Sequence, residues 1–285
     1  MTTMTPPAAP TRTPVRVPLW RRFGTALLAH PAVRTLGPFV PFLLIWWAVA
    51  AAGTVNAAFI AGPVEVWQSF TELVRKGMMP SYLGDSLERL AYGVGFGLLI
   101  GLPLGFVVAL SSWARRLTWP LLLFFQAIAD IAWLPILIVW FGFSLTSVTF
   151  VIVYTVVFPL MLGIVAGVDQ VPRELVNAAR SLGAGRLRVF FEVIVPGSLP
   201  AVASGVRTGL GYGWRALIAA EIIVGTSGIG FMMFDARRAG EVSQVFLGMI
   251  VLGVLWYALD ALILAPFERA TVERWGLVRQ MEAAR

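Results

Sequence analysis

The sequence predicts an all-α membrane protein with about six transmembrane helices, and three observations lead to this prediction. The 285-residue chain is 58% hydrophobic and only 13% charged, with a mean hydropathy of +0.82, whereas soluble domains average about 25% charged residues. Six apolar runs are long enough to cross a bilayer, which takes about 20 residues. Arginines also concentrate in alternate connecting segments, a pattern that is typical of multi-pass membrane proteins.

The first apolar run covers residues 37–53 and follows a basic segment, 1–36, that is rich in Pro and Thr at its start. We expect this segment to be a disordered cytoplasmic tail. No small-residue cleavage site follows the apolar run, so we interpret the run as a retained span rather than as a signal peptide.

An amphipathic helix is predicted between the first and second runs. Pro63 suits the first position of a helix and Gly77 suits its end. Val66, Phe70 and Leu73 fall on one face of this helix, and the charged residues fall elsewhere. We expect such a helix to lie on the membrane surface.

The remaining runs are 86–110, 117–142, 145–168, 198–224 and 244–266, and Ser86 suits the N-cap of the second run. Glycines recur every four residues in two of these runs, where they let helix backbones approach closely. They are Gly93, Gly97, Gly101 and Gly105, and then Gly205, Gly209 and Gly213. We interpret them as packing faces of a bundle; the alternative is that they are sliding faces of a transporter that rocks.

The charge pattern predicts the orientation of the chain. With the N-terminus inside, most of the 22 Lys and Arg residues fall in cytoplasmic segments. This orientation also places the C-terminal tail, 267–285, in the cytoplasm.

Several functions are excluded by the composition. The chain has no Cys and one His, which excludes thiolate chemistry and a multi-histidine metal site. Its single lysine, Lys76, lies in VRKGMM, so the chain has no P-loop for ATP. Because the arginines lie between apolar runs, the net charge of +7 does not indicate a nucleic-acid partner. We therefore predict no catalytic residues and no metal site.

Five ionisable residues fall inside the predicted spans, where each costs roughly 2.5–3.5 kcal/mol at a helix centre and should face protein or water. For Arg207 we expect pairing with other charges, and Asp260 suits a position near the inner interface. Three are candidates for lining a solute pathway, together with a neighbouring proline: Asp130, Pro135, Arg215 and Glu221. Two alternatives stay open, namely that Asp130 makes a buried structural hydrogen bond and that Glu221 reaches lipid headgroups.

A basic segment interrupts the apolar sequence between the fourth and fifth runs. Pro172 suits a helix start, and Gly183 suits the end of that helix. A second short helix follows, which we expect to end at Pro196. Two short helices in a cytoplasmic loop indicate a docking surface, or else a hairpin resting on anionic lipid.

This segment resembles the cytoplasmic loop of permease subunits of binding-protein-dependent ABC importers, whose pattern is EAA-x3-G-x9-I-x-L-P. The matching positions are Asn177, Ala178, Ala179, Gly183, Val193, Val195 and Pro196, with Asn177 in place of the glutamate. The stretches LPILIVWFG and GVRTGLGYGWRALIAAEII are similar to the nitrate, sulfonate and taurine branch of these permeases. The resemblance covers residues 60–265.

The resemblance implies a type I ABC importer permease fold over residues 37–266, with a coupling loop at 169–197. The residues implied to contact the ATPase are Asn177, Ala178, Ala179, Arg180, Gly183, Arg186, Arg188 and Pro196. The implied partners are two copies of an ATPase subunit that binds ATP and Mg, a second permease copy, membrane lipid, and a periplasmic or lipid-anchored solute-binding protein. The chain itself would bind no cofactor and would lie in the bacterial cytoplasmic membrane. The implied solute is a small anion such as a sulfonate, taurine or nitrate.

The chain departs from the branch at one place. Members often have a proline just before the segment that begins at Ile131, where this chain has Ala129 and Asp130. Asp130 is therefore a candidate contact for a cationic group of the solute. Two other functions remain as alternatives, an ion-coupled secondary transporter that works without an ATPase and a membrane-embedded enzyme.

Overall fold

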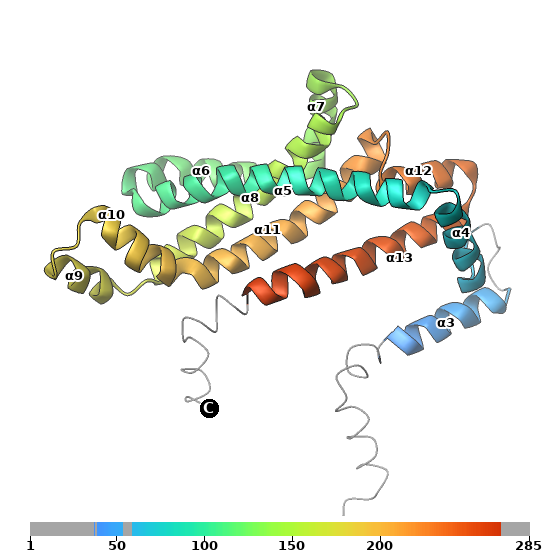
Figure 1. Ribbon diagram of the computed structural model, residues 1–285. Coiled ribbons are helices and arrows are strands. Elements are labelled where there is room, and N and C mark those ends of the chain that lie inside the picture. Colours follow the sequence, from blue (N-terminus) through green and yellow to red (C-terminus); the bar gives the residue numbers. More distant parts are fainter. Residues whose placement is uncertain (1–36, 38, 54–58, 269–285) are drawn as a thin grey trace, which may run out of the picture. The chain divides into compact units, whose positions relative to one another are not determined.

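The computed structural model describes residues 37, 39–53 and 59–268, and every regular element in this part of the chain is helical (Figure 1). The chain divides into two units, 1–57 and 58–285, which are described separately. The first unit contains α3 (Phe39–Ala51), a 13-residue apolar helix. This helix lies within the predicted first run and is shorter than the ~20 residues that a bilayer crossing takes. The predicted tails, 1–36 and 269–285, lie outside the described residues.

The second unit holds the other helices. In chain order these are α4 (Pro63–Arg75), α5 (Met78–Leu110), α6 (Ser112–Ala127), η1 (Asp130–Trp133), α7 (Leu134–Phe141), α8 (Leu145–Gln170), α9 (Arg173–Ser181), α10 (Arg186–Val189), η2 (Phe190–Ile194), α11 (Val195–Val224), α12 (Ile229–Ala239), α13 (Val242–Leu259) and η3 (Asp260–Leu264). Four continuous helices are long and apolar enough to cross a membrane: Met78–Leu110, Leu145–Gln170, Arg186–Val224 and Val242–Glu268. The all-α membrane fold is thus confirmed.

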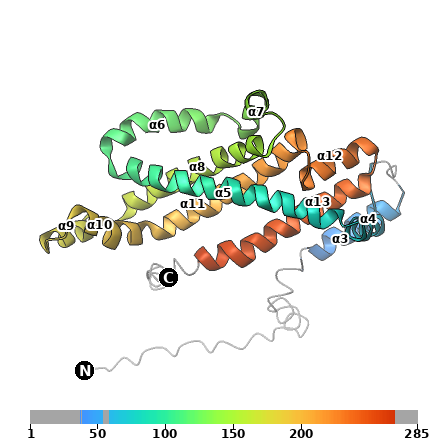
Figure 2. The ribbon, with the colours of Figure 1, turned by 45° about the horizontal axis from the view of Figure 1, so that its top comes forward.

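Helix α8 forms the centre of this unit, with α5 and α11 packed along it (Figures 1 and 2). Its side chains at Ile152, Val156, Leu160 and Ile164 are fully buried. The predicted glycine stripe of α5 lies directly against these four residues, one glycine to each. The stripe of α11 also faces α8, and Gly205 packs on Gly163. Both glycine stripes are therefore packing faces that let three helix backbones come together.

The predicted third run, 117–142, is a broken element rather than one straight helix, and its two helices together are long and apolar enough to count as a fifth span. Helices α6 and η1–α7 are bent by 89° at a break between Ala127 and Asp130. Ile128 and Ala129 adopt extended backbone angles there, and the Asp130 carboxylate then accepts a hydrogen bond from the N–H of Ile131. A carboxylate at the first turn favours the start of a new helix. Pro135 causes no break, since it lies in the first turn of α7, where its missing N–H is not needed.

Two predicted helix ends were wrong. Helix α5 begins at Met78, so Ser86 lies inside it and does not cap it. Pro196 does not end a helix, because the chain stays helical from Arg186 to Val224. A π-helical turn, Phe190–Ile194, precedes Pro196. This wider turn shifts the backbone hydrogen bonds, so the helix passes through a residue that has no N–H to donate.

The amphipathic helix was predicted correctly as α4. It starts at Pro63, and the chain turns away at Gly77, whose φ of 71° is left-handed. Val66 and Leu73 are buried where α4 packs against α5 and α13. Just beyond α4, the Lys76 ammonium lies 2.6 Å from a carboxylate oxygen of Glu72 and lowers the pKa of that carboxyl. The position of α4 on the membrane surface stays a prediction.

Replacing Gly97 by Ala should destabilise the packing of α5 on α8. The added methyl carbon would lie 2.8 Å from Cγ1 of Val156, a side chain with little rotamer freedom. We expect a loss of about 1–3 kcal/mol, as for other overpacked cores. The measurement is the thermal unfolding temperature of the purified protein in detergent.

The matched control is Gly95→Ala on the same helix, since Gly95 has no atom within 4 Å of the added carbon. It should be neutral or stabilising, because Ala is the better helix former. Equal unfolding temperatures for the two variants would contradict the packing assigned to the stripe.

Candidate functional site

Of the two short helices predicted in the basic segment, the first is present as α9, and the second, α10, is the beginning of the long helix that continues to Val224. Helix α9 has Pro172 at its N-cap and Glu174 in its first turn. Gly183 adopts a left-handed φ of 84° and closes the end of α9 through a hydrogen bond from its N–H to the carbonyl of Arg180. Few residues other than Gly adopt this φ readily, so the predicted helix end has a direct physical cause.

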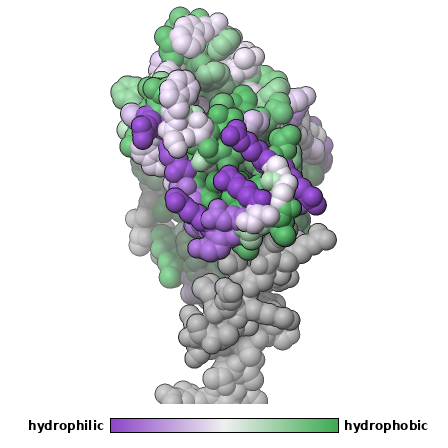
Figure 3. Space-filling view, turned by 90° about the vertical axis from the view of Figure 1, so that its left-hand side faces the viewer, coloured by the Kyte–Doolittle hydropathy of each residue, from purple (hydrophilic) through white to green (hydrophobic). Residues whose placement is uncertain are grey.

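The surface of α9 and α10 is open. None of the residues in α9 is buried. Leu175, Leu182 and Leu187 are exposed, with 88% of Leu182 and 76% of Leu187 accessible. Figure 3 looks onto this end of the second unit and shows hydrophilic side chains gathered there, with hydrophobic ones between them. Exposed apolar residues ringed by charge are typical of a surface that a partner covers.

The predicted coupling arginines differ in their surroundings. Arg188 donates to both carboxylate oxygens of Glu192 at 2.9–3.0 Å, one helical turn away. Arg180 and Arg186 are exposed and form no ion pair within the described residues. The guanidinium groups of Arg180 and Arg186 are therefore accessible to a partner. Asn177 and Ala178 are exposed as well, whereas Ala179 is half-buried.

The hairpin leaves the bundle where α8 and α11 are in close contact. An added Cβ on Gly163 would lie 2.8 Å from Cα of Gly205, and one on Gly167 would lie 2.8 Å from Cβ of Ala201. Arg115 holds the end of α8 through two hydrogen bonds to Asp169, at 2.9 and 3.0 Å. The base of the hairpin is therefore fixed to the spans on both sides.

A second polar site lies at the other end of α11, around Glu221. This side chain is fully buried. One of its carboxylate oxygens accepts a hydrogen bond from Arg89 of α5 at 2.9 Å, and the other accepts from the N–H of Gly230 at 2.9 Å. Ser86 Oγ lies 2.9 Å from both oxygens and accepts a hydrogen bond from the N–H of Ile229. Ser86 and Glu221 thus bind the first N–H groups of α12, where negative charge is favoured.

Glycines and a second serine complete this network. Arg89 also donates to the carbonyl and the hydroxyl oxygen of Ser227, at 2.6 and 2.5 Å. Gly228 adopts a φ of 99°, and a Cβ there would collide with the Glu221 carboxylate. The network therefore connects α5, α11 and the start of α12. It contradicts the alternative that Glu221 reaches lipid headgroups.

The structure separates the predicted pathway residues. Asp130 lines a cavity of about 240 Å³ with Tyr154 and Tyr212, and Arg215 lines a different cavity. Pro135 is exposed on α7. Arg207 pairs as expected, with two hydrogen bonds of 2.9 Å to Asp260 and a further ion pair to Glu268.

Sequence reasoning missed Arg89, which lies within the predicted run 86–110. The available signal was chemical: a cation in one apolar run needs an anion from another, and Glu221 is such an anion. The spacing of Gly225, Gly228 and Gly230 after Glu221 was a second signal, because close approach to a side chain requires residues without Cβ.

Breaking the Arg89–Glu221 pair should destabilise the protein strongly. Arg89→Gln or Glu221→Gln leaves the other charge buried without its partner, which costs about 3–5 kcal/mol in buried pairs. The double variant removes both charges and should lose less than the sum of the two single losses. The measurement is the unfolding temperature of the three variants.

Glu72→Gln serves as the control, because it breaks an exposed ion pair and should leave that temperature unchanged. Strictly additive losses for Arg89 and Glu221 would show that the two side chains do not act as a pair.

The comparisons with known proteins agree with this architecture. Residues 97–266 match the family described as "Binding-protein-dependent transport system inner membrane component". The taurine transport system permease protein TauC of Escherichia coli (strain K12) is 31% identical over 86% of this chain and 90% of its own length. The bicarbonate transport system permease protein CmpB of Synechococcus elongatus is 30% identical over 90% of this chain and 92% of its own.

A further relative is the nitrate import permease protein NrtB of Leptolyngbya laminosa, which is 29% identical over 84% of this chain and 88% of its own length. Among solved structures, an inward-facing form of the MetNI methionine ABC transporter superposes with a TM-score of 0.53. It covers 66% of this chain and 93% of that one at 18% identity, which supports the fold alone.

These matches confirm the resemblance to the taurine, sulfonate and nitrate branch, and they do not favour an ion-coupled secondary transporter. They also indicate a multi-pass membrane protein that works with an ATPase and a solute-binding protein. The chain belongs to the family of binding-protein-dependent transport system inner membrane components, in which it is the permease subunit of an ABC importer.

Proposed function

We propose that this permease imports a small anion and is moved by a separate ATPase that docks on α9 and α10. One observation carries the coupling proposal: no residue of α9 is buried, although the base of the hairpin is fixed to the spans. The proposed solute class is a sulfonate, taurine or nitrate. It is supported by the relatives whose names specify taurine, bicarbonate and nitrate transport.

The proposed coupling follows from the shape of the chain. Leu175, Leu182 and Leu187 would enter a groove on the ATPase, and Arg180 and Arg186 would contact acidic residues at its rim. From Arg186 the chain continues as one 39-residue helix to Val224. A displacement of the docked hairpin is therefore passed directly to α11, which changes the pathway between its two openings.

The remaining partners and the topology are part of the same proposal. Two ATPase copies would bind ATP and Mg, a second copy of this chain would complete the pathway as a homodimer, and a solute-binding protein would deliver the anion outside. Both termini would lie in the cytoplasm. The single lysine fits a chain without a phosphate loop, because Lys76 follows a surface helix and pairs with Glu72.

Gly183→Val should weaken the contact with the ATPase. A β-branched residue at a left-handed φ is strained by roughly 1–2 kcal/mol, so the end of α9 should rearrange. We expect less ATPase to co-purify and ATP-driven uptake to fall by about tenfold, which corresponds to 1.4 kcal/mol of coupling. The measurement is the ATPase-to-permease ratio after affinity purification.

Gly77→Val is the matched control, since Gly77 has a similar φ and the same open surroundings but follows α4. It should retain the full amount of ATPase. Unchanged retention in Gly183→Val would contradict docking at this hairpin.

Asp130→Asn tests the proposed contact with a cationic group of the solute. If the carboxylate meets an ammonium, uptake of taurine should fall relative to uptake of ethanesulfonate, which lacks the amine. The measurement is uptake of the two compounds by proteoliposomes that contain the complete transporter. An unchanged ratio would assign Asp130 to the local start of η1 instead.

A further inference from the structure

The geometry points to one face of α11 as a water-exposed wall of the solute path. Arg215 is the residue on this face that attracts oxoanions. The wall consists of Ser204, Thr208, Tyr212 and Arg215, hereafter the polar face. This inference rests on the proposed import of an anion, and it identifies the side chains that handle the solute's charge.

The spacing of the polar face places its side chains together. The four residues follow one another at intervals of four, four and three, so they share one side of the helix. All four are exposed. Gly205, Gly209 and Gly213 lie on another side of the helix and pack against α8. The packing of α11 on α8 therefore leaves the polar face open.

Arg215 lacks an anionic partner in the described part of the chain, which distinguishes it from Arg89 and Arg207. Arg89 pairs with Glu221, and Arg207 pairs with Asp260. Arg215 contacts only weaker groups, namely the carbonyl of Gly211 at 3.4 Å and the ring of Tyr212 at 4.5 Å. A cation on an open face of a transmembrane helix is costly against lipid, so this face requires water or an anion.

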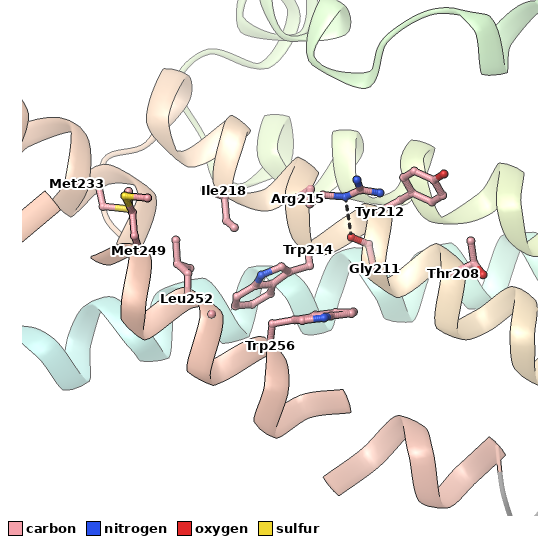
Figure 4. Close-up of a pocket in the computed structure, with 11 residues that line it drawn as sticks. Thr208, Gly211, Tyr212, Trp214, Arg215, Ile218, Met233, Met249, Leu252 and Trp256 are labelled. Atoms are coloured by element: carbon pink, nitrogen blue, oxygen red, sulfur yellow. Dashed lines mark hydrogen bonds between the residues drawn. The ribbon is translucent and has the colours of Figure 1, made fainter. Parts of the chain in front are cut away.

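Three hollows adjoin the polar face. The largest, of about 720 Å³, lies among α11, α12 and α13 and includes Thr208, Tyr212 and Arg215 in its lining (Figure 4). A hollow of about 540 Å³ is lined by Ser204, Thr208 and Tyr212. The third, of about 240 Å³, contains Tyr212 and Asp130. Tyr212 borders all three, so the three hollows lie next to one another along this side of α11.

Figure 4 shows the guanidinium of Arg215 and the ring of Tyr212 on one side of α11, with Trp214 and Trp256 on the other. A guanidinium offers several N–H donors in one plane, which suits the oxygen atoms of a sulfonate, nitrate or bicarbonate. The carboxylate of Asp130 borders only the smallest hollow, so the half of the face near Arg215 is the half that attracts anions. The contact between Arg215 and Tyr212 is loose, so an anion can bind to Arg215 and leave again, as a transport path requires.

The natural absence of cysteine makes a direct test practicable, because any introduced thiol is the only one in the chain. Thr208→Cys places a thiol on the polar face. Val254→Cys places one on α13 at a residue that is 62% exposed. Membrane vesicles with the complete transporter are treated with a negatively charged methanethiosulfonate, sulfonatoethyl, and separately with a positively charged one, trimethylammonioethyl.

We expect the thiol at position 208 to react with both reagents at least about tenfold faster than the thiol at 254, because charged reagents reach only thiols in water. The anionic reagent should react faster than the cationic one at position 208. Adding Arg215→Gln should lower this anion-to-cation rate ratio by about threefold or more. Arg215→Lys retains the positive charge and should preserve the ratio. It is included because the glutamine variant could fail to fold. Arg116→Gln, on α6, is the control that should change nothing.

Two results would overturn the inference. Equally slow labelling at positions 208 and 254 would show that the polar face is covered, by lipid or by a second copy of the chain. Fast labelling with a ratio unaffected by Arg215→Gln would show a wet face on which the guanidinium does not attract anions. Co-purification of the ATPase with each variant is measured in parallel. Its loss in the parent protein would contradict the proposed function, whereas intact complexes with either labelling result would contradict only this inference.

Discussion

The close approach of α5 and α11 to α8 is the constraint on which the rest of the structure depends. Between helices in lipid the hydrophobic driving force is small, so association relies on packing and hydrogen bonds. Glycines of α5 and α11 meet the buried aliphatic side chains of α8 and bring the backbones together. This packing also fixes the rotation of α11 about its axis, and that rotation decides which of its residues remain open.

Helix α11 then joins the two polar sites of the chain. Its C-terminal part carries Glu221, whose pair with Arg89 holds α5 and the start of α12. Its other end continues without a break into α10 and the open hairpin. A helix of 39 residues is about 58 Å long, which exceeds the thickness of a bilayer. The hairpin and the surroundings of Glu221 are therefore linked by one continuous helix.

Local signals in the sequence predicted local features well. Pro63, Gly77, Pro172 and Gly183 marked the ends of α4 and α9, because proline and left-handed glycine act on the backbone directly. The glycine spacing predicted the packing faces, and the cost of a charge inside an apolar run predicted that Arg207 is paired. The exposed surface of the hairpin was also expected from its composition.

The features that were missed depend on residues far apart in the sequence or on single dihedral angles. Ser86 was assigned to a helix end from its local sequence alone. Its actual partner, Glu221, lies 135 positions away and gives no local signal. The bend before Asp130 was missed because hydrophobic residues continue through it, and only the extended angles of Ile128 and Ala129 create it. Composition cannot reveal either feature.

The π-helical turn at Phe190–Ile194 has a consequence for the geometry of force transfer. Such a turn contains one residue more than an α-helical turn, and each residue rotates a helix by about 100°. The one additional residue therefore sets the angle, about the axis of α11, at which α9 and α10 project from α11. Family members that lack it would have to aim the same hairpin through a different loop length.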